Sequence, residues 1–96
     1  MPRPTGRADA REEVRMDNRI AILGIIVENQ EAGNLVQEHL HSCAGYIVGR
    51  MGIPYREKGV SIISVALDAP ADVINTLAGK IGSLSGVSAR AIYSRN

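Results

Sequence analysis

The 96-residue chain is poor in aromatic residues and in cysteine. It has three Tyr and no Phe or Trp, so its core must be built from Ile, Leu, Val and Ala, which bury less area per side chain. A single cysteine, Cys43, excludes an internal disulfide and favours a reducing cytoplasm. No apolar run approaches the ~20 residues of a membrane span, and residues 1–15 lack a signal peptide's apolar stretch. We therefore expect a soluble cytoplasmic protein with no membrane partner.

Neither sign of charge is in excess. The chain has 11 Lys and Arg against 10 Asp and Glu. Residues 1–19 hold five of the Arg and four of the acids, which leaves six of each sign in residues 20–96. A domain this neutral lacks the basic footprint of a nucleic-acid binder, so direct nucleic-acid binding is not expected. The length predicts one small domain that can bury only a modest core by itself.

Two short apolar runs do not alternate with polar residues. They are Ile20–Val27 and Val60–Leu67. A strand with one wet face reads apolar, polar, apolar, whereas these runs carry aliphatic side chains on both faces. Two helices can cover one face of the sheet. A second copy of the chain is the simplest cover for the other, because a bare apolar patch of this size exceeds what monomers usually expose. We expect a homo-oligomer, a dimer or a tetramer.

The chain reads as an arm followed by one domain. Residues 1–18 form the predicted arm, with a short helix from Asp9 to about Met16, and residues 19–96 form the domain. Arg recurs at every fourth position of the arm, which indicates either a solvated helix face or a surface that docks on a neighbouring subunit or an acidic partner.

Periodicity predicts the order β-α-β-β-α-β within the domain. The first helix, Glu31–Ser42, places Ala32, Leu35, Val36, His39, Leu40 and Cys43 on its inner face. The second begins at a cap on Asp68 or Ala69, with Pro70 in its first turn, and ends at Gly82. The predicted strands cover residues 19–28, 46–55, 60–67 and 87–94, and Pro54 makes the second an edge or bulged strand. Right-handed crossovers then give an α+β, ferredoxin-like fold: a four-stranded antiparallel sheet with strands one and three central and two helices on one face.

His39, His41 and Cys43 are the residues best suited to bind a metal, because His and Cys are good ligands for zinc, nickel or iron. On a helix, His39 and Cys43 share a face, whereas His41 points about 160–200° away, so the three do not converge. A site would need further ligands from another subunit. The alternative places His39 at the edge of the core, His41 on the surface and Cys43 in the core as a small residue.

Other motifs carry less chemistry. Gly49–Gly52 and Gly79–Gly82 match the Gly-x-x-Gly loop that clamps a nucleic-acid backbone, but one lies in a predicted strand and the other ends a helix. No nucleophile, base and orienting group stand in a recognisable set, so neither an enzyme nor a resident cofactor is expected.

The turn after the first strand is a candidate ligand site. Asn29, Glu31, Gly33 and Asn34 stand at a helix N-terminus, where free N–H groups and the helix dipole favour an anion. A glycine in the first helical turn costs stability, which indicates close approach by a ligand or by a second backbone. Tight packing against a neighbouring subunit explains the same residues equally well.

With this element order in place, Gly33-Asn34-Leu35 resembles the start of ACT domains, small regulatory modules that pair and bind amino acids between subunits. Nearly the whole chain also resembles the iron-only hydrogenase system regulators. The stretches that carry this second resemblance are Arg15-Met16, Leu40-His41, Ile47–Tyr55, Ser61–Ser64, Gly79–Gly82 and Gly86-Val87. That family is similar to ACT domains and to the metal-sensing C-terminal domain of the nickel-responsive regulator, which implies an oligomeric ferredoxin-like fold. His41 fits the family pattern, whereas His39 and Cys43 do not.

The resemblance implies a non-enzymatic, ACT-like regulatory module that binds a small effector or a protein partner between subunits, with a role in transcriptional regulation of an iron-only hydrogenase system. It brings no DNA-binding module, so direct repression would need an added partner or the arm. The predicted ligand site comprises Asn29, Glu31, Gly33, Asn34, Arg50, Gly52 and Tyr55, with Arg50 as its anion-binding side chain and Tyr55 closing it. The alternatives are a metal sensor using His39, Cys43 and a partner's His41, and a purely structural oligomer.

Overall fold

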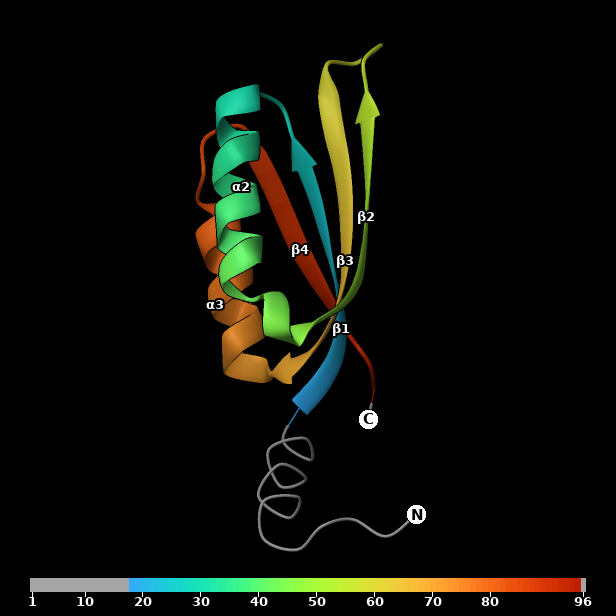
Figure 1. Ribbon diagram of the computed structural model, residues 1–96, viewed down its shortest axis with the longest axis vertical. Helices are drawn as coiled ribbons and strands as arrows, with labels where there is room; N and C mark the ends of the chain where they lie inside the picture. Colours follow the sequence, from blue (N-terminus) through green and yellow to red (C-terminus); the bar gives the residue numbers. More distant parts are fainter. Residues whose placement is uncertain (1–17, 96) are drawn as a thin grey trace, which may run out of the picture.

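The computed structural model describes residues 18–95, which fold into a sheet with two helices on one face (Figure 1). The elements follow in the order β1 (Asn18–Val27), α2 (Gln30–Ser42), a 3-10 turn (Ala44–Tyr46), β2 (Ile47–Tyr55), β3 (Val60–Pro70), α3 (Ala71–Gly82) and β4 (Val87–Tyr93). The four strands are antiparallel in the order β2-β3-β1-β4. This confirms the predicted ferredoxin-like fold and the central position of the two apolar runs.

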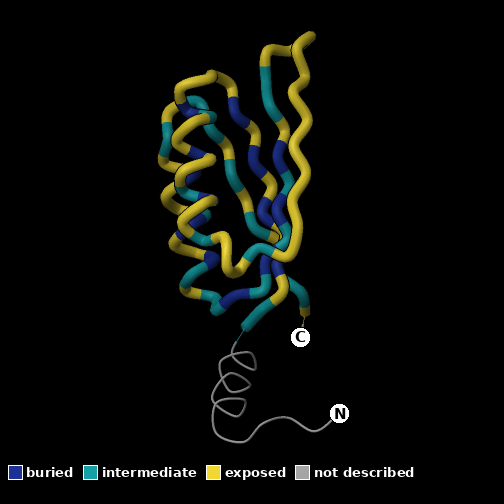
Figure 2. Tube along the Cα trace, in the orientation of Figure 1, coloured by how far each residue is buried: buried dark blue, intermediate teal, exposed yellow. Residues whose placement is uncertain are grey.

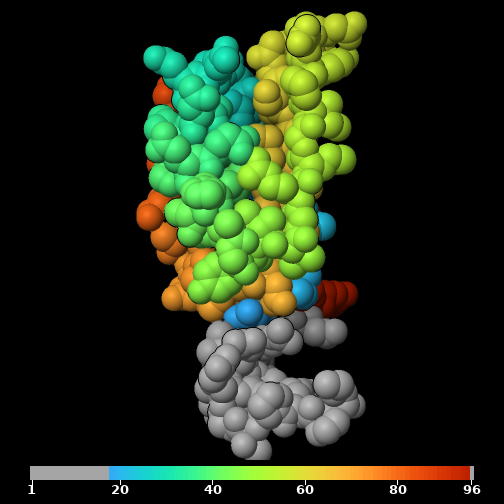
Figure 3. All heavy atoms as spheres, in the orientation of Figure 1, coloured from blue at the N-terminus to red at the C-terminus, as the bar shows by residue number. Residues whose placement is uncertain are grey.

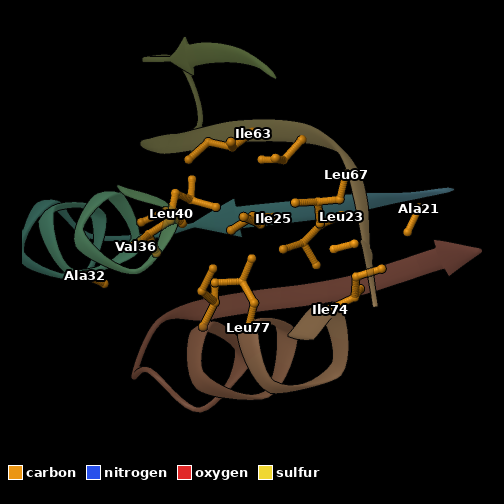
Figure 4. Packing of buried hydrophobic residues seen from close by; sticks show 14 residues of the cluster. Ala21, Leu23, Ile25, Ala32, Val36, Leu40, Ile63, Leu67, Ile74 and Leu77 are labelled. Carbon is orange, nitrogen blue, oxygen red and sulfur yellow. The ribbon is translucent and has the colours of Figure 1, made fainter. Parts of the chain in front are cut away.

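The core lies between the sheet and the helices. Odd-numbered residues of β1, from Ala21 to Val27, point into it, and so do the odd-numbered residues of β3 from Ile63 to Ala69. Figure 4 shows these side chains meeting those of α2 and α3. The buried residues of the core are Ala21, Leu23, Ile25, Val27, Ala32, Val36, Leu40, Ile63, Val65, Leu67, Ala69, Ile74, Leu77 and Ile81. They include no Tyr, as expected from so aromatic-poor a chain.

Helix α2 buries a narrower stripe than the sequence predicts. Ala32, Val36 and Leu40 are buried, and Cys43 packs against the core. Leu35, predicted to be buried with them, is 43% exposed. It lies about 100° around the helix from Val36, and that rotation takes it off the sheet.

The start of α3 also differs from the prediction. Asp68 and Ala69 do not cap the helix but continue β3, where they pair with Ile20 and Arg19 of β1. The Asn18 side-chain amide donates to the Asp68 backbone carbonyl at 3.4 Å. Pro70 is the N-cap of α3, and it makes no side-chain hydrogen bond to the helix. Pairing with β1 thus extends the strand up to the residue where proline ends it.

β2 is an edge strand, as Pro54 predicts, and it is almost fully exposed (Figure 2). A bulge at Val48 shifts its register against β3, so that Ile47 pairs with Leu67 and Gly49 with Ala66. Both helices lie over the other three strands, so the helix-side residues of β2 remain open to solvent. This uncovered strip is what creates the candidate site described below.

The opposite side of the sheet carries aliphatic side chains, and neither helix of residues 18–95 lies on it (Figure 1). Alternation and register place Ile20, Ile22, Ile26, Met51, Ile53, Ile62 and Ile92 on this helix-free face. Each of these side chains is at least 40% exposed. The prediction that the central strands are apolar on both faces is therefore confirmed, whereas their cover by a second copy stays a prediction.

The predicted arm and its short helix lie outside the described residues, apart from Asn18, which belongs to β1. Within residues 18–95, neither helix has the length and apolar character that crossing a bilayer requires.

Candidate functional site: a groove between α2 and β2

Two adjoining hollows run between α2 and the uncovered side of β2. The first, which we call the hairpin hollow, has a volume of about 410 Å³. It is lined by Val27, Asn29, Gln30, Gly33, Asn34, Gln37, Pro54, Tyr55, Arg56, Gly59, Val60 and Ser61. Figure 3 shows the furrow between α2 and the β2–β3 hairpin. The volume falls within the range of small-molecule sites, ~300–1,000 Å³.

The second hollow, which we call the Arg50 hollow, has a volume of about 390 Å³. It is lined by Gln37, Leu40, His41, Ala44, Ile47 and Arg50. Gln37 borders both hollows and accepts a hydrogen bond from the Arg50 guanidinium. The Gln37–Arg50 contact is therefore the partition between the two halves of one groove.

The structure brings together part of the predicted ligand site. Asn29, Gly33, Asn34 and Tyr55 line the hairpin hollow, and Arg50 lines the adjoining one. Glu31 and Gly52 line neither hollow. Gly52 lies on the helix side of β2, opposite Ile63, with open space where a Cβ would stand.

Four polar lining residues were not among the predicted ligands: Gln30, Gln37, Arg56 and Ser61. A signal for Gln37 was present in the sequence. Asn34, Gln37 and His41 are spaced as one polar face of α2, and this face borders the groove. Arg56 and Ser61 are brought in by the hairpin, whose position against α2 has no local sequence signal.

Asn29 has a structural role in addition to lining the hairpin hollow. Its Oδ1 accepts from the Ala32 backbone N–H at 2.7 Å, which caps α2. Its Nδ2 donates to the Ser85 backbone carbonyl at 3.3 Å, and the Glu28 N–H donates to the Gly86 carbonyl at 2.8 Å. The start of α2 is thus tied to the loop before β4, so Asn29 fixes the wall of the groove.

The charge of the groove is positive. Arg56 lines the hairpin hollow and Arg50 lines the other, and no Asp or Glu stands among the described residues that line either one. The Tyr55 hydroxyl donates to the carboxylate of Glu57 at 2.9 Å, and Glu57 itself lines neither hollow. Amide and guanidinium donors without a competing carboxylate suit an anionic ligand.

The metal-binding candidates are divided between two places. His39 and Cys43 border a hollow of about 190 Å³ between α2 and α3, together with Asp72 and Lys80. His41 borders the Arg50 hollow on another side of α2, as the helical spacing predicts. Among residues 18–95, no three His, Cys, Asp or Glu side chains gather closely enough to hold a metal ion. One chain alone therefore supplies at most part of such a site.

The βαββαβ order and the four-stranded sheet define the chain as a ferredoxin-like α+β domain. Residues 19–91 match a family described as "TM1266-like: Iron-only hydrogenase system regulator, putative". The chain belongs to this family, since the match covers well over half of its length.

Solved structures agree with this assignment. The chain is 35% identical to TM1266 of Thermotoga maritima, an uncharacterized protein, with a TM-score of 0.78 over 81% of this chain and 99% of that one. Two more distant structures share the fold. The C-terminal domain of MgtC from Mycobacterium tuberculosis has a TM-score of 0.64 at 11% identity, over 83% of this chain and 92% of that one. A formyltetrahydrofolate deformylase from Pseudomonas putida KT2440 has a TM-score of 0.61 at 16% identity, over 80% of this chain and 29% of that one. No curated protein matches the chain.

Proposed function

We propose that this protein is a non-enzymatic, ACT-like regulatory module that binds a small anionic effector in the groove between α2 and β2. The observation that supports it most directly is the convergence of four predicted ligand residues on the hairpin hollow, with Arg56 beside them and Arg50 in the adjoining hollow. Membership in a family named for regulation gives the effector a role.

The polar groups of the groove are suited to an anion. Amide groups of Asn34, Gln30 and Gln37 can donate or accept hydrogen bonds, and the two arginines provide charge and paired N–H donors. An amino-acid carboxylate or a nucleotide phosphate matches these groups. The groove is open along β2, so an effector bound there would stay partly exposed unless a neighbouring subunit closed the groove.

We further propose that the protein works as a homo-oligomer and acts on an iron-only hydrogenase system through a partner. A regulator of transcription needs a DNA-reading surface, and the balanced charge of the chain does not provide one. An effector bound at the boundary between subunits would change how they meet, and a partner protein would sense that change.

A melting screen with anions tests the proposal. A ligand at about 100 times its Kd stabilises the folded state by ~2.7 kcal/mol, which gives a clear rise in melting temperature. We expect such a rise with at least one amino acid or nucleotide. Arg56→Gln and Arg50→Gln should abolish it.

Lys58→Gln is the matched control. It removes the same charge from the same hairpin turn as Arg56→Gln, but Lys58 lines neither hollow. The rise in melting temperature should survive this change. If no amino acid or nucleotide moves the melting temperature, or if all three variants lose the shift equally, the groove is not the effector site.

One observation favours a second candidate function, metal sensing: His39 and Cys43 border the same small hollow, with Asp72 beside them. A partner chain's His41 would have to complete the site. Native mass spectrometry separates the two functions. A stoichiometric metal that is lost when His39 and Cys43 are both changed to Ala supports the sensor, whereas metal-free protein that responds to an anion supports the effector module. A structural oligomer remains if neither response is found.

A further inference from the structure

The helix-free face of the sheet has a relief of two ridges and a trough. Register aligns Ile53, Ile62 and Ile26 across β2, β3 and β1 as the first ridge, and Ala66, Ile22 and Ile92 across β3, β1 and β4 as the second. Between them, Gly24 and Ser64 are paired neighbours at the centre of the sheet. Two of the smallest residues thus lie between two rows rich in isoleucine, with Met51 and Arg90 at the two ends of their own row.

The trough is part of an open hollow of about 630 Å³, which also reaches Ala89 of β4 and Gly82 of α3 on the helix side. Its walls and floor on this face are Gly24, Ile26, Ile62, Ser64, Ser88 and Arg90. The low floor does not result from crowding within the chain. A Cβ added to Gly24 would meet nothing nearer than the Arg90 carbonyl at 3.9 Å, and the backbone there is not left-handed. The chain's own fold would accept a side chain at this position, so the glycine needs another reason.

Charge is confined to the margin of this face. On its described strands, Asp68 stands near one end, and Arg90 stands on the outer strand β4, where it pairs with Gly24 and bounds the trough on one side. The two central strands carry no charge from Ile20 to Val27 or from Val60 to Leu67. Protein–protein interfaces have this plan: an apolar centre depleted of charge within a polar rim. The four strands have 10, 9, 11 and 7 residues. At ~3.4 Å per residue and ~4.8 Å between strands they give a face of roughly 600 Å², about three quarters of the ~800 Å² per partner of a standard interface.

We propose that a second copy of this chain covers the helix-free face, with the Ile26–Ile62 ridge of each copy seated in the Gly24–Ser64 trough of the other. A two-fold axis that lies between the two sheets and runs across the strands makes the contact mutual. It places the ridge of the first copy in the trough of the second, and the ridge of the second copy in the trough of the first. Both helices lie on the other side of the sheet, so they do not obstruct such a sandwich (Figure 1). Sheets packed in this way stand ~10 Å apart with their strands nearly aligned.

This inference rests on the homo-oligomer in the proposed function and adds one surface through which it forms. The effector groove lies on the other side of the sheet, so a subunit that closed the groove would have to meet this one through a second contact. Gly24→Val is the sharpest test, because it fills the trough while a β-branched residue suits a central strand. The variant should keep the circular dichroism of the wild type, and its urea midpoint should match at a concentration where both chains are monomeric. Its self-association should weaken at least tenfold in Kd, measured by sedimentation velocity between about 1 and 100 µM.

Gly52→Val is the matched control for association. It makes the same change in a strand, and its Cβ also meets open space, but on the helix side of β2. It should associate like the wild type. Ile26→Thr, which keeps the branched shape and adds a hydroxyl to the ridge, should weaken association in the same direction as Gly24→Val.

The outcomes separate the surface from the oligomer itself. A wild-type mass of 10.3 kDa at every concentration overturns both this inference and the proposed homo-oligomer. A wild-type oligomer that Gly24→Val and Ile26→Thr leave unchanged overturns the assigned face alone. A wild-type dimer that Gly24→Val turns into a monomer, or a tetramer that it turns into a dimer, supports the inference. The anion screen does not enter any of these readings.

Discussion

The two faces of β1 are made of nearly the same residue types, but one is buried and the other is exposed to solvent. Ile25 is 1% exposed beneath the helices, whereas its neighbour Ile26 is 45% exposed on the helix-free face. One strand, with one composition, therefore contributes to a core on one side and an open apolar surface on the other. Hydrophobicity alone does not mark the core. What distinguishes the two faces is the pair of helices, which covers one of them.

The largest effect expected from this comparison comes from truncating the two isoleucines in turn. Ile25→Ala removes fully buried methyl groups and should lower the free energy of unfolding by about 3 kcal/mol, since it leaves a cavity in the core. Ile26→Ala should cost about 1 kcal/mol or less in the isolated chain. Urea unfolding at a concentration where the chain is monomeric measures both. Equal losses would contradict the description of Ile26 as uncovered.

The helices cover one face of the sheet, and this depends on how the start of α2 is attached to the loop before β4. Gly86 lies in that attachment and offers a test of it. Its φ is +78°, and a Cβ there would collide with the Asn29 side-chain amide. Gly86→Ala should therefore cost about 2 kcal/mol, since it combines a strained backbone with a lost contact. Gly59 has a similar φ of +67° with open space around it, so Gly59→Ala should cost only about 1 kcal/mol. Thermal melts that rank the two in the reverse order would refute the attachment.

Asn29 supplies the other half of that attachment. Asn29→Ala removes the helix cap and the bond to Ser85, and should cost about 1 kcal/mol. Asn29→Asp keeps the accepting oxygen and adds a favourable charge at the helix N-terminus, so its cost should be under about 0.5 kcal/mol. Denaturant midpoints of both variants give the measurement. If Asp is as damaging as Ala, then the bond to Ser85 matters more than the cap.

The smallest effect concerns Gly33, which stands in α2 where the groove begins. A Cβ there would lie 3.8 Å from the Val27 side chain, an ordinary contact. Gly33→Ala should raise the free energy of unfolding by roughly 0.5–1 kcal/mol, because alanine is the better helix former. The added methyl group should also reduce the shift produced by an effector in the hairpin hollow. A stabilised variant that still responds fully would place the effector away from Gly33.

Most of the fold was predictable because its signals are local. Non-alternating runs identified the central strands, Pro54 identified the edge strand, and helical spacing set the buried stripes. The errors arose where pairing or packing overrides local preference. β3 continues through Asp68 because β1 offers it hydrogen-bond partners, and Leu35 turns away because the sheet meets only a narrow stripe of α2.

The candidate site was less predictable. Asn29, Gly33 and Asn34 follow one another along the chain, so a turn analysis could find them together. Arg56 reaches the same hollow only because the hairpin lies beside α2, and Arg50 stands in the neighbouring hollow behind Gln37. Contacts between segments far apart in the sequence decide which residues line the groove, and a single sequence does not show these contacts.

Nuclear magnetic resonance contacts between a labelled copy and an unlabelled copy of the chain provide the most direct measurement of what covers the helix-free face. Methyl-labelled chains would be mixed with unlabelled ones, and magnetisation transfer recorded only between molecules. Cross-peaks from the Ile26 and Ile62 methyl groups to Gly24 and Ser64 protons of the other copy are the predicted result. Transfer that involves only the helices or the outer edge of β2, with these isoleucines silent, would contradict it.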